Sequence, residues 1–233
     1  MIRVLLHHRF PDRRLQLAAL LLLVWLASGT WIRLQAAGPG TQVQQRKTST
    51  PYTGDLSIFE YSDRDKKLQV ERVMDILGIA PGKTVADIGA GSGWFSVRAA
   101  RRVTPTGFVY AADINPEAIR YIRQRVHREG ISNVRAVLST PADPRLPAAS
   151  IDVALLLKTY HEVAEPVTLL RNLRNALRPG ARLGIIDRNG SGDDHGVDRG
   201  IVANEARQAG YRLIGEYDFV RGDREDYFLV FER

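Results

Sequence analysis

The 233-residue sequence contains no cysteine, so thiolate nucleophiles, cysteine-ligated zinc and disulfide bonds are excluded. It has no internal repeat, and its histidines show neither HxH nor HExxH spacing. His7 and His8 are adjacent, but they lie in a basic N-terminal stretch. We therefore expect no catalytic metal ion. Because the chain has no thiol, cysteine usage gives no indication of the redox compartment.

Acidic residues are scarce at the N-terminus. Residues 1–50 contain seven Lys and Arg against one acid, Asp12, whereas residues 51–233 have a net charge of only +1. The total of +7 therefore comes mainly from the N-terminal stretch and gives little support to nucleic-acid binding. A chain of this length with 44% hydrophobic residues can form one domain with a real core, plus a tail.

Residues 15–32 form an uncharged run between Arg14 and Arg33. As a helix, 18 residues span about 27 Å, just enough for a bilayer core. The basic residues before the run favour a signal peptide or a membrane anchor, with a misassigned start codon as the duller alternative. We expect this segment at 1–37, a flexible linker at 38–51 and a domain at 52–233. The protein would be membrane-anchored or exported, to a bacterial inner membrane or periplasm, although a cytosol-facing domain stays open.

The most informative stretch is TVADIGAGSGWFS, residues 84–96. A short apolar run leads into Gly89, Gly91 and Gly93, and an amphipathic segment starts at Trp94. This pattern predicts a buried strand, a glycine-rich turn and the start of a helix. The helix N-terminus carries free N–H groups and a positive dipole end, which suits a nucleotide-like ligand.

The spacing indicates which kind of nucleotide would fit. A dinucleotide fingerprint requires G-x-G-x-x-G, but this turn reads G-x-G-x-G, and Asp87 lies two residues before it. An acid at that place suits a ligand with an ammonium group better than a pyrophosphate. Asp113 follows Gly93 by 20 residues, where an acid commonly accepts hydrogen bonds from ribose hydroxyls.

The motifs VADIGAGSG and AADIN together make the chain, from about residue 65 to 233, resemble the class I S-adenosylmethionine-dependent methyltransferases. The nearest group is that of the ubiquinone/menaquinone-type small-molecule methyltransferases. The resemblance implies S-adenosylmethionine as cofactor, a small molecule of unknown identity as methyl acceptor, and a Rossmann-like α/β fold. It also creates a conflict, because S-adenosylmethionine is made in the cytosol and an exported domain would lack it.

Apolar periodicity places the elements of the domain. Strands are expected at 84–88, 108–112, 134–138, 151–157 and 182–186, and helices at 65–77, 94–102, 116–129, 166–177 and 199–209. Runs at 211–220 and 227–232, joined by a turn at 221–226, predict an antiparallel hairpin. With the resemblance, this implies a seven-stranded sheet of order 3-2-1-4-5-7-6, its last strand antiparallel and helices on both faces, preceded by the N-terminal hydrophobic helix.

The resemblance also assigns roles to single residues. The cofactor would contact Asp87, Gly89, Ala90, Gly91, Gly93, Asp113, Ile114 and, at the adenine, Asp143. Family members use the segment before the first helix as a cap, for which Tyr52, Phe59 and Tyr61 are available; these rings could equally close the core edge. Each acid has a structural alternative, as a turn, cap or surface residue.

The acceptor side is expected after the fourth strand, in the sequence KTYHE. The candidate catalytic residues are His161, as a general base, Tyr160 and Lys158, with Glu162 beside them. His161 and Glu162 could instead only cap the next helix. The polar loop 189–198 around His195 is either a mobile lid or a plain surface loop. The motif Asn-Pro-Pro-Tyr of amino-group methyltransferases is missing, which disfavours such acceptors.

Two other functions remain open from the sequence. An NAD(P)-dependent oxidoreductase of Rossmann type would share the first strand and turn, but its sheet would end in a sixth parallel strand. A non-catalytic nucleotide-binding module could keep the fold after export. The oligomeric state cannot be inferred from these patterns.

Overall fold

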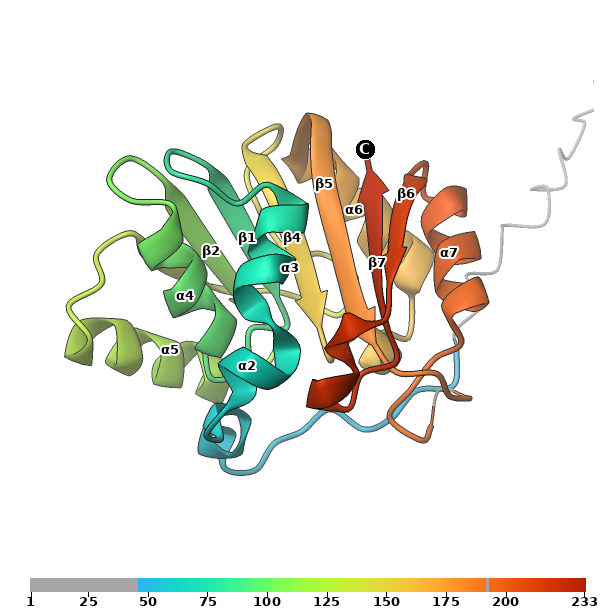
Figure 1. Cartoon of the computed structure of the whole chain (residues 1–233), viewed down its shortest axis with the longest axis horizontal. Helices are drawn as coiled ribbons and strands as arrows, with labels where there is room; N and C mark the ends of the chain where they lie inside the picture. The colour runs from blue at the N-terminus through green and yellow to red at the C-terminus, as the bar shows by residue number, and fades with distance from the viewer. Residues whose placement is uncertain (1–45, 192) are drawn as a thin grey trace, which may run out of the picture. The chain divides into compact units, whose positions relative to one another are not determined.

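The computed structural model describes residues 46–191 and 193–233, whose core is one seven-stranded sheet of order β3-β2-β1-β4-β5-β7-β6 (Figure 1). This confirms the expected order. The strands are β1 (Thr84–Ile88), β2 (Phe108–Asp113), β3 (Val134–Leu138), β4 (Ile151–Leu157), β5 (Leu177–Asp187), β6 (Arg212–Tyr217) and β7 (Tyr227–Glu232). The first five strands are parallel, and β7 runs antiparallel to both β5 and β6.

Helices cover both faces of the sheet, because alternate strand residues point to opposite sides. The helices are α2 (Arg64–Leu68), α3 (Val70–Leu77), α4 (Trp94–Arg102), α5 (Pro116–Arg128), α6 (Pro166–Ala176) and α7 (Arg199–Gln208). Val85 and Leu155 pack in a cluster with α3 and α4, whereas Ala86 and Leu156 pack with α6 and α7. Figure 1 accordingly shows α3 and α4 in front of the sheet and α6 behind it.

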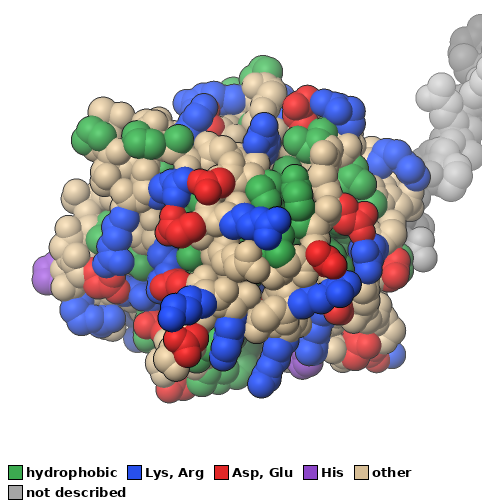
Figure 2. Space-filling model, in the orientation of Figure 1, with side chains coloured by type: hydrophobic (Ala, Val, Ile, Leu, Met, Phe, Trp, Pro, Cys, Tyr) green, Lys and Arg blue, Asp and Glu red, His purple; other side chains and the backbone are tan. Residues whose placement is uncertain are grey.

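Charges of both signs are interspersed on the face turned to the viewer in Figure 2. Two of the ion pairs that link α4 to the preceding helices are Arg98 with Asp65 and Arg102 with Glu71, both at 2.5 Å. Exposed pairs of this kind contribute only about 0–1 kcal/mol each. The fold therefore depends more on its apolar clusters than on these surface charges.

The helix expected at 65–77 is split in two, so that prediction was wrong in detail. Gln69 adopts a left-handed conformation with φ of 54° between α2 and α3. The break lets both Leu68 and Val70 be buried, and the Gln69 amide donates a hydrogen bond to the carbonyl oxygen of Phe219 at 3.1 Å. A tertiary contact therefore overrides the helical periodicity.

The boundaries of the C-terminal hairpin also differ from expectation. β6 ends at Tyr217, and a 3-10 helix, η3 (Phe219–Asp223), replaces the end of the predicted strand. The reason is burial: Val220 is fully buried, and Phe219 packs edge-on against Phe228. β5 is longer than expected, because Leu177 already pairs with Ile151 where a helix end was predicted.

The predicted hydrophobic helix over residues 15–32 lies outside the described residues. Among residues 46–191 and 193–233, no helix is both long enough and apolar enough to cross a membrane. The last part of the predicted linker is described: residues 46–51 lie against the domain, with Ser49 buried.

Candidate functional site

A cavity of about 630 Å³ opens where the parallel strands β1, β2 and β4 end. Its wall combines the glycine-rich turn, the loops that follow the strands, and the segment 46–61, which we call the strap. The strap contains a 3-10 helix, η1 (Leu56–Glu60). The carboxyl ends of parallel strands form the usual ligand crevice of open α/β sheets.

Two glycines of the glycine-rich turn share a left-handed backbone conformation but lie on different sides of the turn. Gly89 has φ of 70°, and a Cβ there would lie 2.2 Å from Cγ2 of Thr159. Gly93, with φ of 72°, is the N-cap of α4 and packs under Ile122. Gly89, Ala90 and Gly91 line the cavity, as predicted, whereas Gly93 is not among its lining residues. Gly93 therefore shapes the turn from behind.

Asp87 is the last acid before the turn and lines the cavity while only 2% exposed. Burial raises the pKa of Asp87 to about 6, and the nearby Asp113 adds to the rise. The hydroxyl of Ser96 donates to its carboxylate at 2.6 Å and works in the opposite direction. A cationic group bound beside this buried carboxyl group would lower its pKa again and favour its ionised form.

Asp113 ends β2 and is held rigidly. Its two carboxylate oxygens accept hydrogen bonds from the backbone N–H groups of Gly91 and Asn115, both at 2.8 Å. Burial raises the pKa of Asp113, against the lowering effect of these backbone donors. Both Asp113 and the half-exposed Ile114 line the cavity, as the sequence predicted.

Asp143 is not among the cavity-lining residues, although its neighbours Thr140, Pro141 and Pro144 are. Its carboxylate accepts from the backbone N–H of Arg145 at 2.8 Å. In this structure Asp143 therefore shapes the loop beside the cavity, and its contact with an adenine stays a prediction.

The cavity wall fits a polar, partly cationic ligand. One buried polar atom on it, Oγ of Ser92, has no hydrogen-bond partner within the described part of the chain, whereas Nε of Arg64 lies 3.7 Å from the carboxylate of Asp223. Buried polar groups are normally satisfied, so the Ser92 hydroxyl points to a missing partner. The strap adds the rings of Tyr52 and Phe59, which pack edge to face at a centroid distance of 5.3 Å.

Tyr61, the third ring expected in the cap, does not line the cavity. Its hydroxyl donates a hydrogen bond to Asp223. The Lys158 ammonium group also reaches this region: it donates to the backbone oxygen of Asp223 at 2.8 Å and pairs with the carboxylate of Glu225 at 2.9 Å. Lys158 lines the cavity as a cation already engaged by acids, which argues against a role as a base.

Tyr160 is fully buried and absent from the cavity lining, so the structure does not place this predicted catalytic residue near a substrate. Its hydroxyl donates to Glu205 at 2.7 Å, and the guanidinium of Arg46 lies 4.9 Å from its ring centroid. Within KTYHE, Tyr160 therefore turns into the core, while its neighbours Thr159 and His161 line the cavity.

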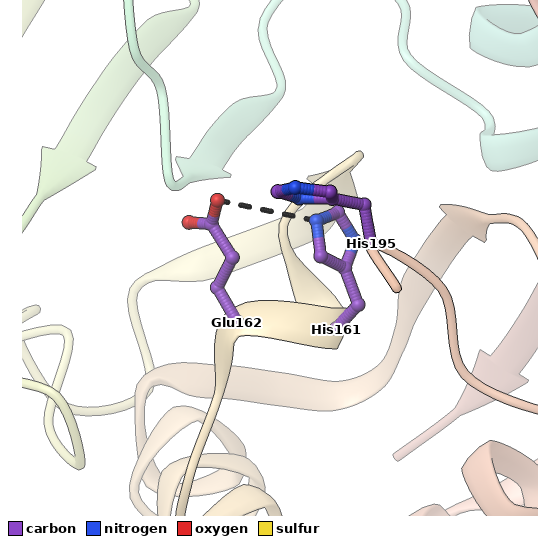
Figure 3. A group of neighbouring side chains, drawn as sticks. All are labelled: His161, Glu162 and His195. Carbon is purple, nitrogen blue, oxygen red and sulfur yellow. Dashed lines mark ion pairs between the residues drawn. The ribbon is translucent and has the colours of Figure 1, made fainter. Parts of the chain in front are cut away.

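His161 is the predicted catalytic residue with the most defined orientation. Its Nδ1 lies 2.8 and 3.0 Å from the carboxylate oxygens of Asp187, the fully buried last residue of β5. Burial alone would lower the pKa of His161, but the hydrogen bond and charge of Asp187 outweigh it and the pKa is raised. With Nδ1 bonded to Asp187, the Nε2 atom is left to face Glu162 at 3.9 Å (Figure 3).

Three residues of the site were missed or undervalued by sequence reasoning. Asp187 follows the apolar run of β5, and an acid at the end of a predicted parallel strand was a readable signal. Arg64 lines the cavity and lies one position before the start of the helix expected at 65–77. His195 reaches the cavity from the loop after β5 and lies edge to face with His161, at a ring centroid distance of 5.8 Å.

Comparisons with known proteins are consistent with this geometry. Residues 79–208 match the family model described as a methyltransferase domain. The ubiquinone/menaquinone biosynthesis C-methyltransferase of Ectopseudomonas mendocina is 30% identical over 115 residues, which are 49% of this chain and 45% of that protein. The arsenite methyltransferase of Halobacterium salinarum is 31% identical over 109 residues, 47% of this chain and 28% of that protein.

Among solved structures, an S-adenosylmethionine-dependent methyltransferase from Aquifex aeolicus superposes with a TM-score of 0.68 at 24% identity. The match covers 77% of this chain and 99% of that one. At this identity the likeness shows the fold alone. The chain spans less than half the length of the curated relatives that it matches.

Proposed function

Because the chain belongs to the methyltransferase domain family, matched over residues 79–208, we propose that it transfers a methyl group from S-adenosylmethionine to a small-molecule acceptor. The observation that carries the proposal is the pair of buried acids, Asp87 and Asp113, on either side of a glycine-rich turn in one cavity. The terminal antiparallel hairpin and the G-x-G-x-G spacing favour this activity over an NAD(P)-dependent oxidoreductase.

The cofactor residues of the proposal follow the geometry of the turn. Asp113 would accept hydrogen bonds from the ribose hydroxyls, because its fixed carboxylate keeps lone pairs beyond those used by the backbone. The methionine part of the cofactor would lie along Gly89, Ala90 and Gly91. The carboxylate of Asp87 would attract the ammonium group of this part. Asp143 would contact the adenine from the loop beside the cavity. The cofactor itself supplies an electrophilic methyl group on sulfur.

The acceptor is proposed to lie at the His161 end of the cavity. Val163 and Leu169 line the cavity near His161 and Glu162, so an apolar body with one polar reacting group would fit. The enzyme would mainly align this group with the methyl carbon. The Asp187–His161 pair can hold or accept a proton at Nε2 when the acceptor must lose one. The two relatives named above differ in the chemistry of their acceptors.

Ligand binding tests this proposal directly. At about 100 times its dissociation constant, S-adenosylhomocysteine should stabilise the protein by about 2.7 kcal/mol, whereas NAD(H) should not.

Replacement Asp113→Ala should weaken the affinity for S-adenosylhomocysteine by about 10- to 100-fold, because a hydrogen bond to a charged group contributes about 1.5–3 kcal/mol. Calorimetric titration measures both. The matched control is Asp75→Ala, at the surface of α3 and away from the cavity. Unchanged affinity in Asp113→Ala would refute the assignment.

We also propose that residues 15–32 tether the domain to a membrane or direct its export. The proposal is supported by the length of the uncharged run and the basic residues before it. Cell fractionation should recover the full chain with membranes, and deletion of residues 1–37 should release it. Protease protection in spheroplasts then shows which side the domain faces. A periplasmic domain without access to the methyl donor would favour the non-catalytic binding module instead.

A further inference from the structure

Three side chains able to bind a metal ion converge at the acceptor end of the cavity. His161 and Glu162 lie on the short 3-10 helix η2 (Tyr160–Glu162) after β4, and His195 lies on the loop between β5 and α7. One candidate ligand atom from each residue lies within 4.8 Å of the other two (Figure 3). All three residues line the cavity, so an ion there would face the proposed acceptor.

The orientation of His161 is the second observation. The carboxylate of Asp187 is fully buried, bonded to Nδ1 of His161 and to the backbone N–H groups of His161 and Arg188, both at 3.0 Å. A carboxylate that accepts from one ring nitrogen fixes the tautomer and leaves the other nitrogen as a ligand atom. This outer-shell partner is typical of histidines that bind metal ions.

The backbone of His195 is the third observation. His195 has φ of 58°, a left-handed conformation that histidine adopts more often than most residues other than glycine. Its N–H donates to Oγ of Ser49 at 2.9 Å, and its carbonyl accepts from Nε of Arg188 at 2.6 Å. Contacts from the strap and from the end of β5 thus hold His195 with its ring beside His161.

The donor set indicates the class of ion. Two imidazoles and one carboxylate suit borderline divalent ions such as Zn²⁺, Fe²⁺, Co²⁺ or Mn²⁺, whereas Ca²⁺ and Mg²⁺ prefer oxygen ligands alone. His161 is buried, Glu162 is intermediate and His195 is exposed, so the cluster has a route to solvent. Three protein ligands also leave coordination positions open for a substrate.

We propose that Nε2 of His161, the carboxylate of Glu162 and a ring nitrogen of His195 bind a divalent transition-metal ion, and that the methyl acceptor carries an ionisable hydroxyl that coordinates this ion. The metal site stands on its own geometry, whereas the acceptor class rests on the proposed function. Coordination lowers the pKa of the hydroxyl, which releases its proton to solvent. The oxygen then bonds to the methyl carbon, and the carbon–sulfur bond breaks with its electron pair left on sulfur.

Sequence spacing had indicated no metal ion, because His195 is 34 positions from His161 and no local motif joins them. The fold brings them together by placing the end of β5 beside the end of β4. His161 would then act as a ligand when the ion is bound, and the ion would replace it as the group that promotes loss of the acceptor proton.

The test uses the untagged full chain and Co²⁺ as the probe. His7 and His8 could bind Co²⁺ by themselves, so the background protein carries His7→Ala and His8→Ala. Titration should give one equivalent of bound Co²⁺ with the visible absorption of a protein-ligated ion. His195→Asn tolerates the left-handed backbone, and Glu162→Gln keeps the side-chain volume. Each should weaken Co²⁺ binding by at least about tenfold, since even outer-shell changes cost 10- to 100-fold. His127→Ala, at an exposed position of α5, should bind as the background protein does.

The outcomes separate this inference from the proposed function. Co²⁺ that fails to bind, or binds equally well to His195→Asn and Glu162→Gln, overturns the metal site. S-adenosylhomocysteine is titrated into the same proteins. If it binds while Co²⁺ does not, the metal inference fails and the methyltransferase proposal stands. If Co²⁺ binds to the predicted residues and S-adenosylhomocysteine does not, the metal site is supported and the proposed function fails.

Discussion

At the scale of single residues, Asp87 shows how a binding site opposes stability. Its carboxylate lies in a nearly closed environment, and burial raises its pKa to about 6. The folded protein therefore binds a proton at Asp87 more tightly than the unfolded chain does, where an aspartate has a pKa of about 3.9. Between these two values a rise in pH removes a stabilising proton, and at neutral pH the ionised, buried carboxylate is a cost to the unliganded fold.

Replacement Asp87→Asn should therefore stabilise the unliganded protein at neutral pH. A shift of two pKa units corresponds to up to about 3 kcal/mol in the free energy of unfolding at about pH 7.5, and to almost nothing at about pH 4. Urea unfolding at the two pH values measures the difference. The amide can still accept the hydrogen bond from Ser96, so packing is kept. The same variant should bind S-adenosylhomocysteine more weakly, because the ammonium group loses its carboxylate. An equal effect on stability at both pH values would contradict this account.

At the scale of elements, the strap is the part of the cavity wall that precedes the helices and strands of the sheet in the chain. Arg46 anchors its start: the guanidinium pairs with Glu205 at 2.8 Å and donates to the backbone oxygens of Tyr160 and Val163. It therefore ties the strap to α7 and to the segment around η2 together. From there the strap continues past Ser49, which holds His195, to Phe59 at the glycine-rich turn. One segment thus contacts both ends of the cavity.

Replacement Arg46→Ala should loosen the strap without unfolding the domain. Loss of hydrogen bonds to charged groups costs about 1.5–3 kcal/mol, so local opening should become about 10- to 100-fold more frequent. Hydrogen exchange should be faster across residues 46–61 and unchanged in β1 and β4. The control is Lys47→Ala, because the exposed side chain of Lys47 pairs with Asp193 at the surface, so its removal should leave the exchange rates unchanged. Faster exchange throughout the sheet would show instead that Arg46 supports the whole fold.

At the scale of the whole molecule, β7 joins the two larger apolar clusters, one on each face of the sheet. It lies between β5 and β6, and its residues alternate between the faces of the sheet. Phe228 packs on the α3 side, and the centroid of its ring lies 5.6 Å from that of Tyr217 and 6.1 Å from that of Phe219. Phe231 packs on the α6 side. Because the last strand completes both layers, the fold should unfold as one cooperative unit.

Replacement Phe228→Ala should lower the free energy of unfolding by about 3–5 kcal/mol, the usual cost of an emptied aromatic core site. Urea unfolding followed by circular dichroism and by tryptophan fluorescence should give one coincident transition. Leu213→Ala, on the exposed side of β6, is the matched control and should stay within about 0.5 kcal/mol of the parent. Two separated transitions in Phe228→Ala would show that the hairpin unfolds independently.

Local patterns were enough to predict β1, α4 and the glycine-rich turn, because each depends on neighbours in the chain. Gly89 is required by its own backbone angle, and Asn115 caps α5 through a bond to Glu117 two residues away. The turn and the cap of α5 follow such short-range rules, whereas the carboxylate of Asp113 is held by Gly91 across 22 positions. Residues at strand ends, such as Asp113, therefore lie where the sequence placed them.

The acceptor side was decided by tertiary structure. The sequence around Tyr160 does not show that this ring turns into the core while the next residue faces the cavity. Asp187 meets His161 across 26 positions, and His195 joins them only because β5 lies beside β4. Contacts between distant segments depend on packing, burial and the order of strands, which no local periodicity encodes. The sequence by itself thus determined the family, the strand order implied by it and the cofactor turn, and the fold alone determined which side chains meet at the acceptor.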